Sequence, residues 1–285
     1  MKITLKDGSV KEYDHAMSVY DIALDLSEGL ARAACAGEVN GEAVDLRTVV
    51  EEDAQVNILT FSDEGGRAAF HHTTSHIMAQ AIKRLYPEVK LAIGPSIADG
   101  FYYDVDSETP LTNEDLEKIE AEMKKIVKEG LRLERFEKPR EEAIAFMEER
   151  QEPYKVELIQ DLPEDAVISF YQQGEFVDLC AGPHLMNTKP VKAFKLTSLA
   201  GAYWRGSEKN KMLTRIYGVS FTKKADPVSY THLDVYKRQS FAFRDPSCMD
   251  RKRDAGTALS RSGCVGSAGS KGQRDKTQPG AGTAA

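Results

Sequence analysis

The chain has 285 residues, of which 41% are hydrophobic and 29% charged, the usual balance of a globular protein. This length suggests about two domains. No apolar run reaches the roughly 18–20 residues of a membrane span, and the first residues lack a signal-peptide core, so we expect a cytoplasmic protein without membrane contact. Four cysteines, Cys35, Cys180, Cys248 and Cys264, lie far apart, which favours reduced thiols over a disulfide framework.

The net charge of −7 gives no reason to expect a nucleic-acid partner, but the charge is unevenly distributed. Residues 189–224 contain nine Lys and Arg residues and one acid, Glu208, a local net charge of +8 (nine minus one). A cationic rim of this kind suits a phosphate-bearing substrate. A solvated surface explains the same charges, and the count alone does not separate the two interpretations.

Residues 1–61 have the pattern of a small mixed domain. Strand-like stretches occupy residues 2–5, 10–13, 35–39 and 56–61. Asp7-Gly8 and Asn40-Gly41 are turn signals between them. Ser18 is a helix N-cap, and it precedes an apolar stripe formed by Val19, Ile22, Ala23 and Leu26.

This order of hairpin, helix and short strands resembles the ubiquitin-like β-grasp fold of a TGS domain. TGS domains occur at the front of threonyl-tRNA synthetases and in some GTPases and stringent-response proteins, and they are binding or docking modules. We therefore expect no catalytic role here, with His15 at the surface and Cys35 a small buried group.

Residues 62–66 are polar and contain two glycines, which predicts a linker and a domain boundary. A helix is expected from about 67 to 86, ending before a proline. It carries His72 and His76, whose i, i+4 spacing places both imidazoles on one face of the helix. Two half-buried structural histidines are the alternative, because the pattern is short.

A second pair, Cys180 and His184, has the same spacing, but Gly182-Pro183 lies between them and predicts a tight turn. A helix would thus supply two groups and a strand-to-loop corner two more. Three imidazoles and a thiol can hold zinc, or they can perform acid–base chemistry without a metal.

Residues 67–224 predict an α+β domain with an antiparallel sheet. Expected strands cover 100–105, 131–136, 166–171, 176–180, 192–196 and 212–217. Thr112 opens a helix with Asp115 in a capping-box position, and Gly130 ends it. A shorter helix is expected over 140–150, and Pro153-Tyr154-Lys155 is predicted to begin an extended segment.

Residues 225–285 are expected to be a disordered and non-native tail. From 226 onward there are seven Gly, seven Ser and no sustained period, a composition that cannot build a core. The stretch Asp226–Gln239 looks like translated adaptor sequence; a natural disordered tail is the competing view. His232, Cys248 and Cys264 are therefore given no role.

Five features together closely resemble the amino-terminal half of bacterial threonyl-tRNA synthetases, over residues 1 to about 224. They are His72-x-x-x-His76, Gly100-Phe-Tyr-Tyr-Asp104, Lys155, Asp178-Leu-Cys-Ala-Gly-Pro-His184 and Tyr203-Trp-Arg-Gly206. The resemblance implies a TGS domain at 1–61 and, at 67–224, an editing domain that hydrolyses seryl-tRNA(Thr). It also implies a truncated chain without the class II catalytic and anticodon-binding domains, which cannot activate threonine.

The resemblance further implies roles for individual residues. His72, Lys155, His76, Cys180 and His184 would form the catalytic group, with His72 placing or deprotonating water or holding the terminal ribose. The residues expected to line the pocket are Asp178, which would bind the serine ammonium group, together with Tyr103 and Asp104.

The implied partner is the acceptor end of tRNA(Thr). Full-length relatives form homodimers, whereas a truncated chain is compatible with a monomer. Alanyl-type editing modules bind zinc through a comparable quartet, but threonyl-type modules are thought to work without it. We therefore expect no cofactor for editing, with ATP and zinc needed only by the absent catalytic domain. Two alternatives are a non-catalytic tRNA- or partner-binding fragment and a zinc-dependent hydrolase of a small free substrate.

Overall fold

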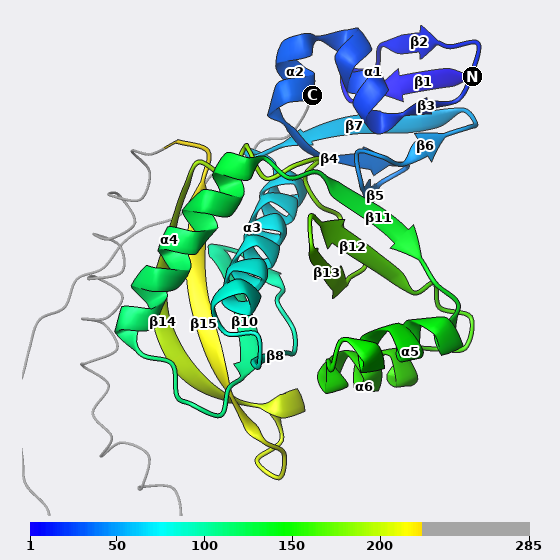
Figure 1. Ribbon diagram of the computed structural model, residues 1–285. Helices are drawn as coiled ribbons and strands as arrows, with labels where there is room; N and C mark the ends of the chain where they lie inside the picture. The colour runs from blue at the N-terminus through cyan, green and yellow to red at the C-terminus, as the bar shows by residue number, and fades with distance from the viewer. Residues whose placement is uncertain (224–285) are drawn as a thin grey trace, which may run out of the picture. The chain divides into compact units, whose positions relative to one another are not determined.

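The structure is a computed structural model that describes residues 1–223 (Figure 1). Residues 1–60 form a five-stranded sheet in the order β2-β1-β7-β4-β5, in which β1 and β7 run parallel and the other neighbours antiparallel. Its strands are β1 (Lys2–Leu5), β2 (Val10–Glu12), β4 (Ala34–Val39), β5 (Glu42–Val44) and β7 (Ala54–Thr60). The remaining elements are α1 (Val19–Leu26), α2 (Glu28–Ala33) and a short pair, β3 (Met17–Ser18) with β6 (Val49–Val50).

Local sequence signals explain this first sheet. The Ser18 hydroxyl caps α1 by accepting from the Asp21 amide at 3.1 Å. Asn40 and Gly41 both have positive φ, 52° and 87°, as the tight turn between β4 and β5 requires. The predicted apolar stripe of α1 packs into the core that the sheet covers. A β-grasp arrangement is thus confirmed, while α2, which Ser27 caps, was not predicted.

Residues 64–221, which we call the second domain, form an α+β arrangement with two antiparallel sheets, also as predicted. The larger sheet has the order β14-β15-β10-β8 with β9 paired to β10, and the smaller has the order β11-β12-β13. The larger sheet contains β8 (Lys90–Leu91), β9 (Ser96–Ile97), β10 (Gly100–Asp106), β14 (Ala193–Tyr203) and β15 (Met212–Phe221). The smaller contains β11 (Leu133–Glu137), β12 (Ser169–Gln173) and β13 (Phe176–Leu179).

Helix α3 (Glu64–Leu85) runs through the middle of the second domain, between the two sheets (Figure 1). The other helical segments are α4 (Asn113–Glu129), α5 (Arg140–Glu149), α6 (Pro153–Asp161) and the 3-10 turn η1 (Trp204–Gly206). α3 is buried on almost every side over its middle turns, and it buries polar as well as apolar residues. Polar side chains in such a helix need partners inside the protein, which marks α3 as a place to look for function.

Two predicted boundaries were wrong. α3 begins at Glu64 rather than near residue 67, because Gly65 and Gly66 form its first turn instead of a linker. The segment that starts at Pro153 is helix α6 and not extended chain. Proline suits the first turn of a helix, where its missing N–H has no intrahelical partner to lose. This correction places Lys155 in the first turn of a helix.

The tail predicted for residues 225–285, with His232, Cys248 and Cys264, lies outside the described residues. Within residues 1–223, none of the helices combines the length and apolar character that crossing a membrane requires.

Gly66 permits the close approach of α3 to the end of β7. A Cβ atom at this position would lie 2.0 Å from the Thr60 carbonyl oxygen. We expect Gly66→Ala to lower the free energy of unfolding by about 1–3 kcal/mol, since the backbone must shift to relieve the overlap. Urea denaturation followed by circular dichroism measures the change.

Gly29→Ala is the matched control, because Gly29 is also in a helical first turn but its added Cβ would meet only Ser27 Oγ, at 3.4 Å. This variant should gain about 0.4–1 kcal/mol through a less flexible unfolded chain. Equal stability of Gly66→Ala and the parent protein would contradict the close approach.

Candidate functional site

The two predicted pairs of donor residues meet at one place. α3 presents His72 and His76 one turn apart, with ring centroids separated by 5.2 Å. Cys180 and His184 lie on the corner that follows β13. One ligand atom from each of the four residues lies within 4.8 Å of the others. We call these four residues the quartet. His76 and His184 are buried, whereas His72 and Cys180 are half-buried, so the quartet opens towards solvent on their side.

The thiol of Cys180 lies between two imidazoles. Its Sγ is 3.4 Å from His72 Nε2 and 3.2 Å from His184 Nε2, and it accepts from the Gly182 amide at 3.3 Å. A thiol has one proton and can donate to only one of the two rings. The direction of each contact therefore depends on which nitrogen of each ring carries the proton.

The Thr73 hydroxyl determines the tautomer of His184. It donates to the Ala69 carbonyl at 2.9 Å and accepts from the Leu185 amide at 2.9 Å. Its remaining contact is with His184 Nδ1 at 3.2 Å. A hydroxyl has a single proton, so Nδ1 must donate, and the unprotonated Nε2 of His184 faces the sulfur.

A buried ion pair lies next to the quartet. Lys155 Nζ is 2.5 Å from Asp178 Oδ1, and both side chains are almost inaccessible to solvent. The Tyr103 hydroxyl donates to Asp178 Oδ2 at 2.5 Å and accepts from Lys155 Nζ at 3.0 Å. His76 Nε2 approaches the same carboxylate at 3.6 Å. Lys155, Asp178 and Tyr103 come from α6, β13 and β10 respectively. The cluster therefore joins α6 and the smaller sheet to the larger sheet.

Asp104 does not join this site. Its carboxylate is held by two hydrogen bonds from Arg215 on β15, at 2.7 and 2.8 Å. Successive residues of a strand point to opposite faces of the sheet, so Tyr103 and Asp104 cannot line the same pocket. The pocket-lining role expected for Asp104 is therefore not supported by its position.

Burial controls the charge state of the quartet. It lowers the pKa of His72 to about 4 and that of His76 to about 3, and it holds the pKa of His184 well below the ordinary value. The same desolvation raises the pKa of the Cys180 thiol to about 12. At neutral pH the site therefore contains three neutral imidazoles and a neutral thiol.

Asp178 shows the opposite balance. Burial alone would raise the pKa of this carboxyl, but the Lys155 ammonium and the hydrogen bonds from Lys155 and Tyr103 together lower it below the ordinary value. Tyr103 is buried beside this negative charge, and its pKa is raised well above the ordinary value. Asp178 is thus the ionised acceptor of the cluster, and Tyr103 is a donor.

The quartet fits a zinc ion by its chemistry. In a tetrahedral zinc site with donors at about 2.0–2.3 Å the donor atoms lie roughly 3.3–3.8 Å apart, so the widest separation in the quartet, up to 4.8 Å, would shorten by about 1 Å on binding. His76 Nδ1 is buried without a hydrogen-bond partner among the described residues. An orphaned imidazole nitrogen beside converging acceptors is compatible with metal binding.

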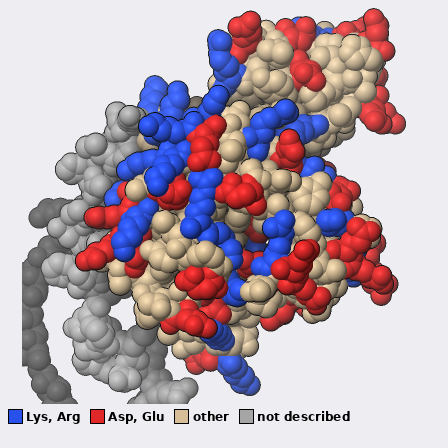
Figure 2. Space-filling model, viewed as in Figure 1, with Lys and Arg blue, Asp and Glu red and all other residues tan. Residues whose placement is uncertain are grey.

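The basic stretch at 189–224 is partly neutralised by acids that the linear count did not include, because four of its nine basic residues form ion pairs with them. The pairs are Lys195 with Glu120 (2.8 Å), Arg205 with Asp161 (2.5 Å), Lys211 with Asp106 (2.8 Å) and Arg215 with Asp104 (2.7 Å). Figure 2 accordingly shows basic and acidic side chains intermixed on the face in view. These partners offset part of the positive charge that the count along the sequence gives.

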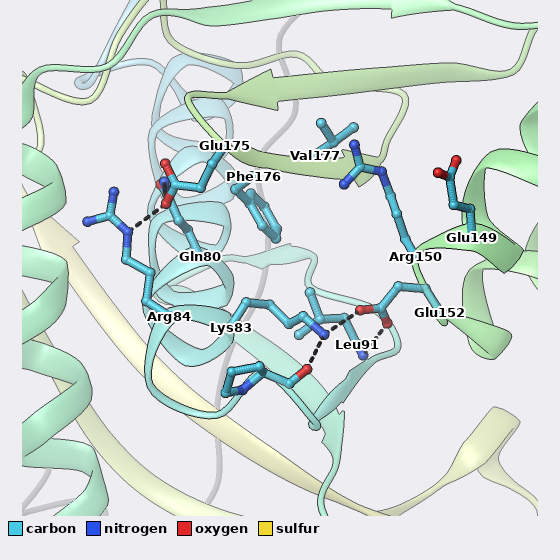
Figure 3. A pocket seen from close by; sticks show the side chains of 11 residues that line it. Gln80, Lys83, Arg84, Leu91, Glu149, Arg150, Glu152, Glu175, Phe176 and Val177 are labelled. Atoms are coloured by element: carbon cyan, nitrogen blue, oxygen red, sulfur yellow. Dashed lines mark hydrogen bonds and ion pairs between the residues drawn. The ribbon is translucent and has the colours of Figure 1, made fainter.

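A cleft of about 630 Å³ lies near the carboxyl end of α3, away from the quartet (Figure 3). Two of its cations are paired with acids, Lys83 with Glu152 at 2.9 Å and Arg84 with Glu175 at 2.6 Å, whereas Arg150 lies over the Phe146 ring, 4.4 Å from its centroid. Phe176 lines the cleft and packs edge-on against His76, with ring centroids 6.2 Å apart. Because two of its cations are already paired with acids and no residue of the quartet lines it, this cleft is a weaker candidate than the quartet.

Sequence reasoning missed three residues of the site: Thr73, Tyr171 and Asp45. Thr73 directly follows His72, so its place within the His-x-x-x-His segment was an available signal. Tyr171 packs against His184, with ring centroids 4.4 Å apart. Asp45 lies in the domain formed by residues 1–60. It contacts Tyr171 and His184, which are 126 and 139 positions away in the sequence. No local pattern could have indicated that contact.

Protonation of the buried histidines should make stability depend on pH. His71, also buried, has its pKa lowered to about 4, like His72. Between about pH 4 and 6.5 the unfolded chain binds more protons than the folded one, so stability falls as pH falls through this window. We expect each such histidine to lower the free energy of unfolding by about 1.4 kcal/mol when the pH falls from 7.5 to 5.5.

Urea midpoints at the two pH values, measured with a chelator present, test this expectation. His71→Gln should reduce the difference by the contribution of one histidine. Midpoints that do not change between pH 7.5 and 5.5 would contradict the neutral, buried state of these rings.

Comparison with known proteins supports two family assignments. Residues 1–60 match the TGS domain, and residues 168–217 match the "Threonyl and Alanyl tRNA synthetase second additional domain". The chain is 66% identical to the threonine–tRNA ligase of Acetivibrio thermocellus over 240 residues, which are 84% of this chain and 38% of that protein. It is 61% identical to the enzyme of Clostridioides difficile over 82% of the chain and 36% of that protein.

The chain thus spans little more than a third of the length of these relatives. The resemblance expected from the five sequence features is confirmed. The chain therefore carries a TGS domain and a second additional domain of the threonyl- and alanyl-tRNA synthetase type, and over 84% of its length it is similar to part of a bacterial threonine–tRNA ligase.

Proposed function

We propose that the second domain hydrolyses the ester bond of seryl-tRNA(Thr), the mischarged product of a threonine-specific ligase. The observation that carries the proposal is the convergence of neutral imidazoles, a thiol and an ammonium group on one partly open site. Ester hydrolysis needs a positioned water, a proton acceptor and a positive charge that stabilises the oxyanion. The imidazoles can position the water and accept its proton, and the ammonium group can supply the charge.

The need for such a step follows from the substrates. Serine lacks only one methyl group of threonine, which is worth about 1–3 kcal/mol of discrimination in a binding pocket. A second site can exclude the larger side chain and hydrolyse the smaller. The partner that this reaction requires is the acceptor end of tRNA(Thr).

His72 is the best placed general base. It is neutral at physiological pH because burial lowers its pKa to about 4, and it reaches the half-open side of the quartet. His184, with its unprotonated Nε2 fixed by Thr73, offers a second acceptor for the same water. Cys180 stays a neutral thiol at this pH and shapes the space between the two rings.

Lys155 and Asp178 give the site a means of responding to its substrate. In the structure the carboxylate is occupied by the Lys155 ammonium at 2.5 Å. We propose that the α-ammonium group of the seryl ester competes for Asp178, which frees Lys155 to face the developing oxyanion. The Tyr103 hydroxyl contacts both side chains, and it would keep them in position while the substrate ammonium replaces Lys155 at Asp178.

A second candidate is metal-assisted hydrolysis, which the orphaned His76 Nδ1 favours. The quartet would hold the zinc ion, which when bound would lower the pKa of its water. The imidazoles and Lys155 already provide a base and a positive charge, so we propose the metal-free route.

The first test is selective deacylation. The chain should hydrolyse seryl-tRNA(Thr) faster than threonyl-tRNA(Thr), by a factor of about 10 to 200 if one methyl group is discriminated. His72→Ala should lower the rate on seryl-tRNA(Thr) by about 10²–10⁴ through loss of the base. The exposed His15 provides the control, because His15→Ala should leave the rate unchanged. Rates equal to spontaneous hydrolysis for the parent chain would favour the non-catalytic tRNA-binding alternative.

The second test concerns the metal. Dialysis against a zinc chelator should leave deacylation unchanged, and elemental analysis should find less than stoichiometric zinc. Activity that disappears with the chelator and returns with zinc, together with zinc that is lost in His76→Ala, would establish the metal-assisted route instead.

A further inference from the structure

We propose that Asp45, a residue of the TGS domain, is a positioning residue for the hydrolytic site of the second domain. It would act on His184, the imidazole whose Nε2 faces Cys180. The inference rests on the proposed function and extends it, because it gives the TGS domain a part in the chemistry.

The Asp45 carboxylate reaches the Cys180–His184 corner directly. Its Oδ2 accepts from the His184 backbone amide at 3.3 Å and from the Tyr171 hydroxyl at 3.0 Å. Asp45 is only 7% exposed, so these bonds are protected from competing water. Its other oxygen, Oδ1, accepts from the Arg47 amide at 3.0 Å and from the Arg47 guanidinium at 2.6 Å.

Arg47 fastens the same TGS turn to the second domain. Its guanidinium donates to the Leu133 carbonyl at 2.5 Å and to the Leu185 carbonyl at 3.1 Å. Leu185 directly follows His184, so the corner is held on both sides of the histidine. Leu46, between the two charged residues, is buried in the TGS core, which anchors the turn within its own domain.

Tyr171 provides a second connection between Asp45 and His184. Its ring packs against the His184 imidazole, and its hydroxyl lies close over Gly182, where a Cβ would be 2.2 Å away. Gly182 has a φ of +79°, a conformation that favours glycine. Asp45 therefore fixes the tyrosine that covers the corner as well as the backbone beneath it.

His184 is therefore positioned by residues of both domains. Thr73 on α3 binds the ring at Nδ1 and the following amide, while Asp45 binds the amide of His184 itself. The direction of Nε2 depends on both supports. Misplacement of a reacting group by about 1 Å can cost roughly a hundredfold in rate.

The test uses the full chain with Asp45→Asn and Tyr171→Phe. We expect Asp45→Asn to lower kcat for seryl-tRNA(Thr) deacylation by about tenfold to a hundredfold with little change in KM. Tyr171→Phe leaves the carboxylate in place and should cause a smaller loss. The double variant should be no slower than Asp45→Asn alone, because both changes remove one shared support.

Asp25 provides a matched control within the TGS domain. Its carboxylate also accepts from a tyrosine hydroxyl, that of Tyr13 at 2.9 Å, and from a cation, Lys11 at 2.6 Å. These partners belong to the TGS domain itself. Asp25→Asn should therefore leave kcat unchanged, although it removes a similar set of bonds.

A spectroscopic measurement separates positioning from a general loss of stability. In ¹⁵N-labelled protein with a chelator present, the His184 amide and imidazole signals should shift in Asp45→Asn and stay in place in Asp25→Asn. A rise in KM alone, or unchanged His184 signals with unchanged kcat, would overturn the proposal. If the parent chain does not deacylate seryl-tRNA(Thr), the proposed function fails, while the His184 signals still report whether Asp45 supports the corner.

Discussion

The buried ion pair between Lys155 and Asp178 is the constraint on which the second domain depends. Its two residues come from α6 and β13, and Tyr103 adds β10 from the larger sheet. Two charges removed from water are tolerated only when each satisfies the other and the remaining hydrogen bonds are made. The ion pair therefore favours the observed packing of α6, β10 and β13, because separating its partners would leave a charge unpaired in the interior.

The same pair sets the electrostatics of the histidines. His76 lies 3.6 Å from the carboxylate, which favours its protonation, but desolvation is the larger effect and the ring stays neutral. A site with neutral imidazoles next to a fixed positive and a fixed negative charge can accept a proton without first losing one. The neutrality of these imidazoles arises from their burial.

Much of this arrangement could be predicted from the sequence. The i, i+4 histidines on a helix and the Cys180–His184 corner were each visible as short patterns, and their meeting followed from the family resemblance. The segment at Pro153 was predicted to be extended, although proline is favoured in the first turn of a helix, which is where it lies in α6. The place of Asp104 was missed because a pocket role was assigned to two neighbouring strand residues, which the alternation of a strand forbids.

Other features had no local signal. The charge count of the basic stretch left two interpretations open because its acidic partners, such as Glu120 and Asp106, lie far away in the sequence. The Asp45 contact likewise joins residues that only the tertiary fold brings together. Charge counts along a chain describe neighbours in sequence, whereas electrostatics acts between neighbours in space.

Thr73 illustrates how much a residue without chemistry of its own can decide. Its hydroxyl has one proton and two lone pairs, and all three are committed, to a carbonyl within α3, to an amide of the corner and to a ring nitrogen. The helical backbone thereby dictates which nitrogen of a distant histidine keeps its lone pair. A serine at this position could make the same hydrogen bond to His184 Nδ1, whereas a valine could not. The residues between the two motif histidines therefore contribute to the site and do more than space them.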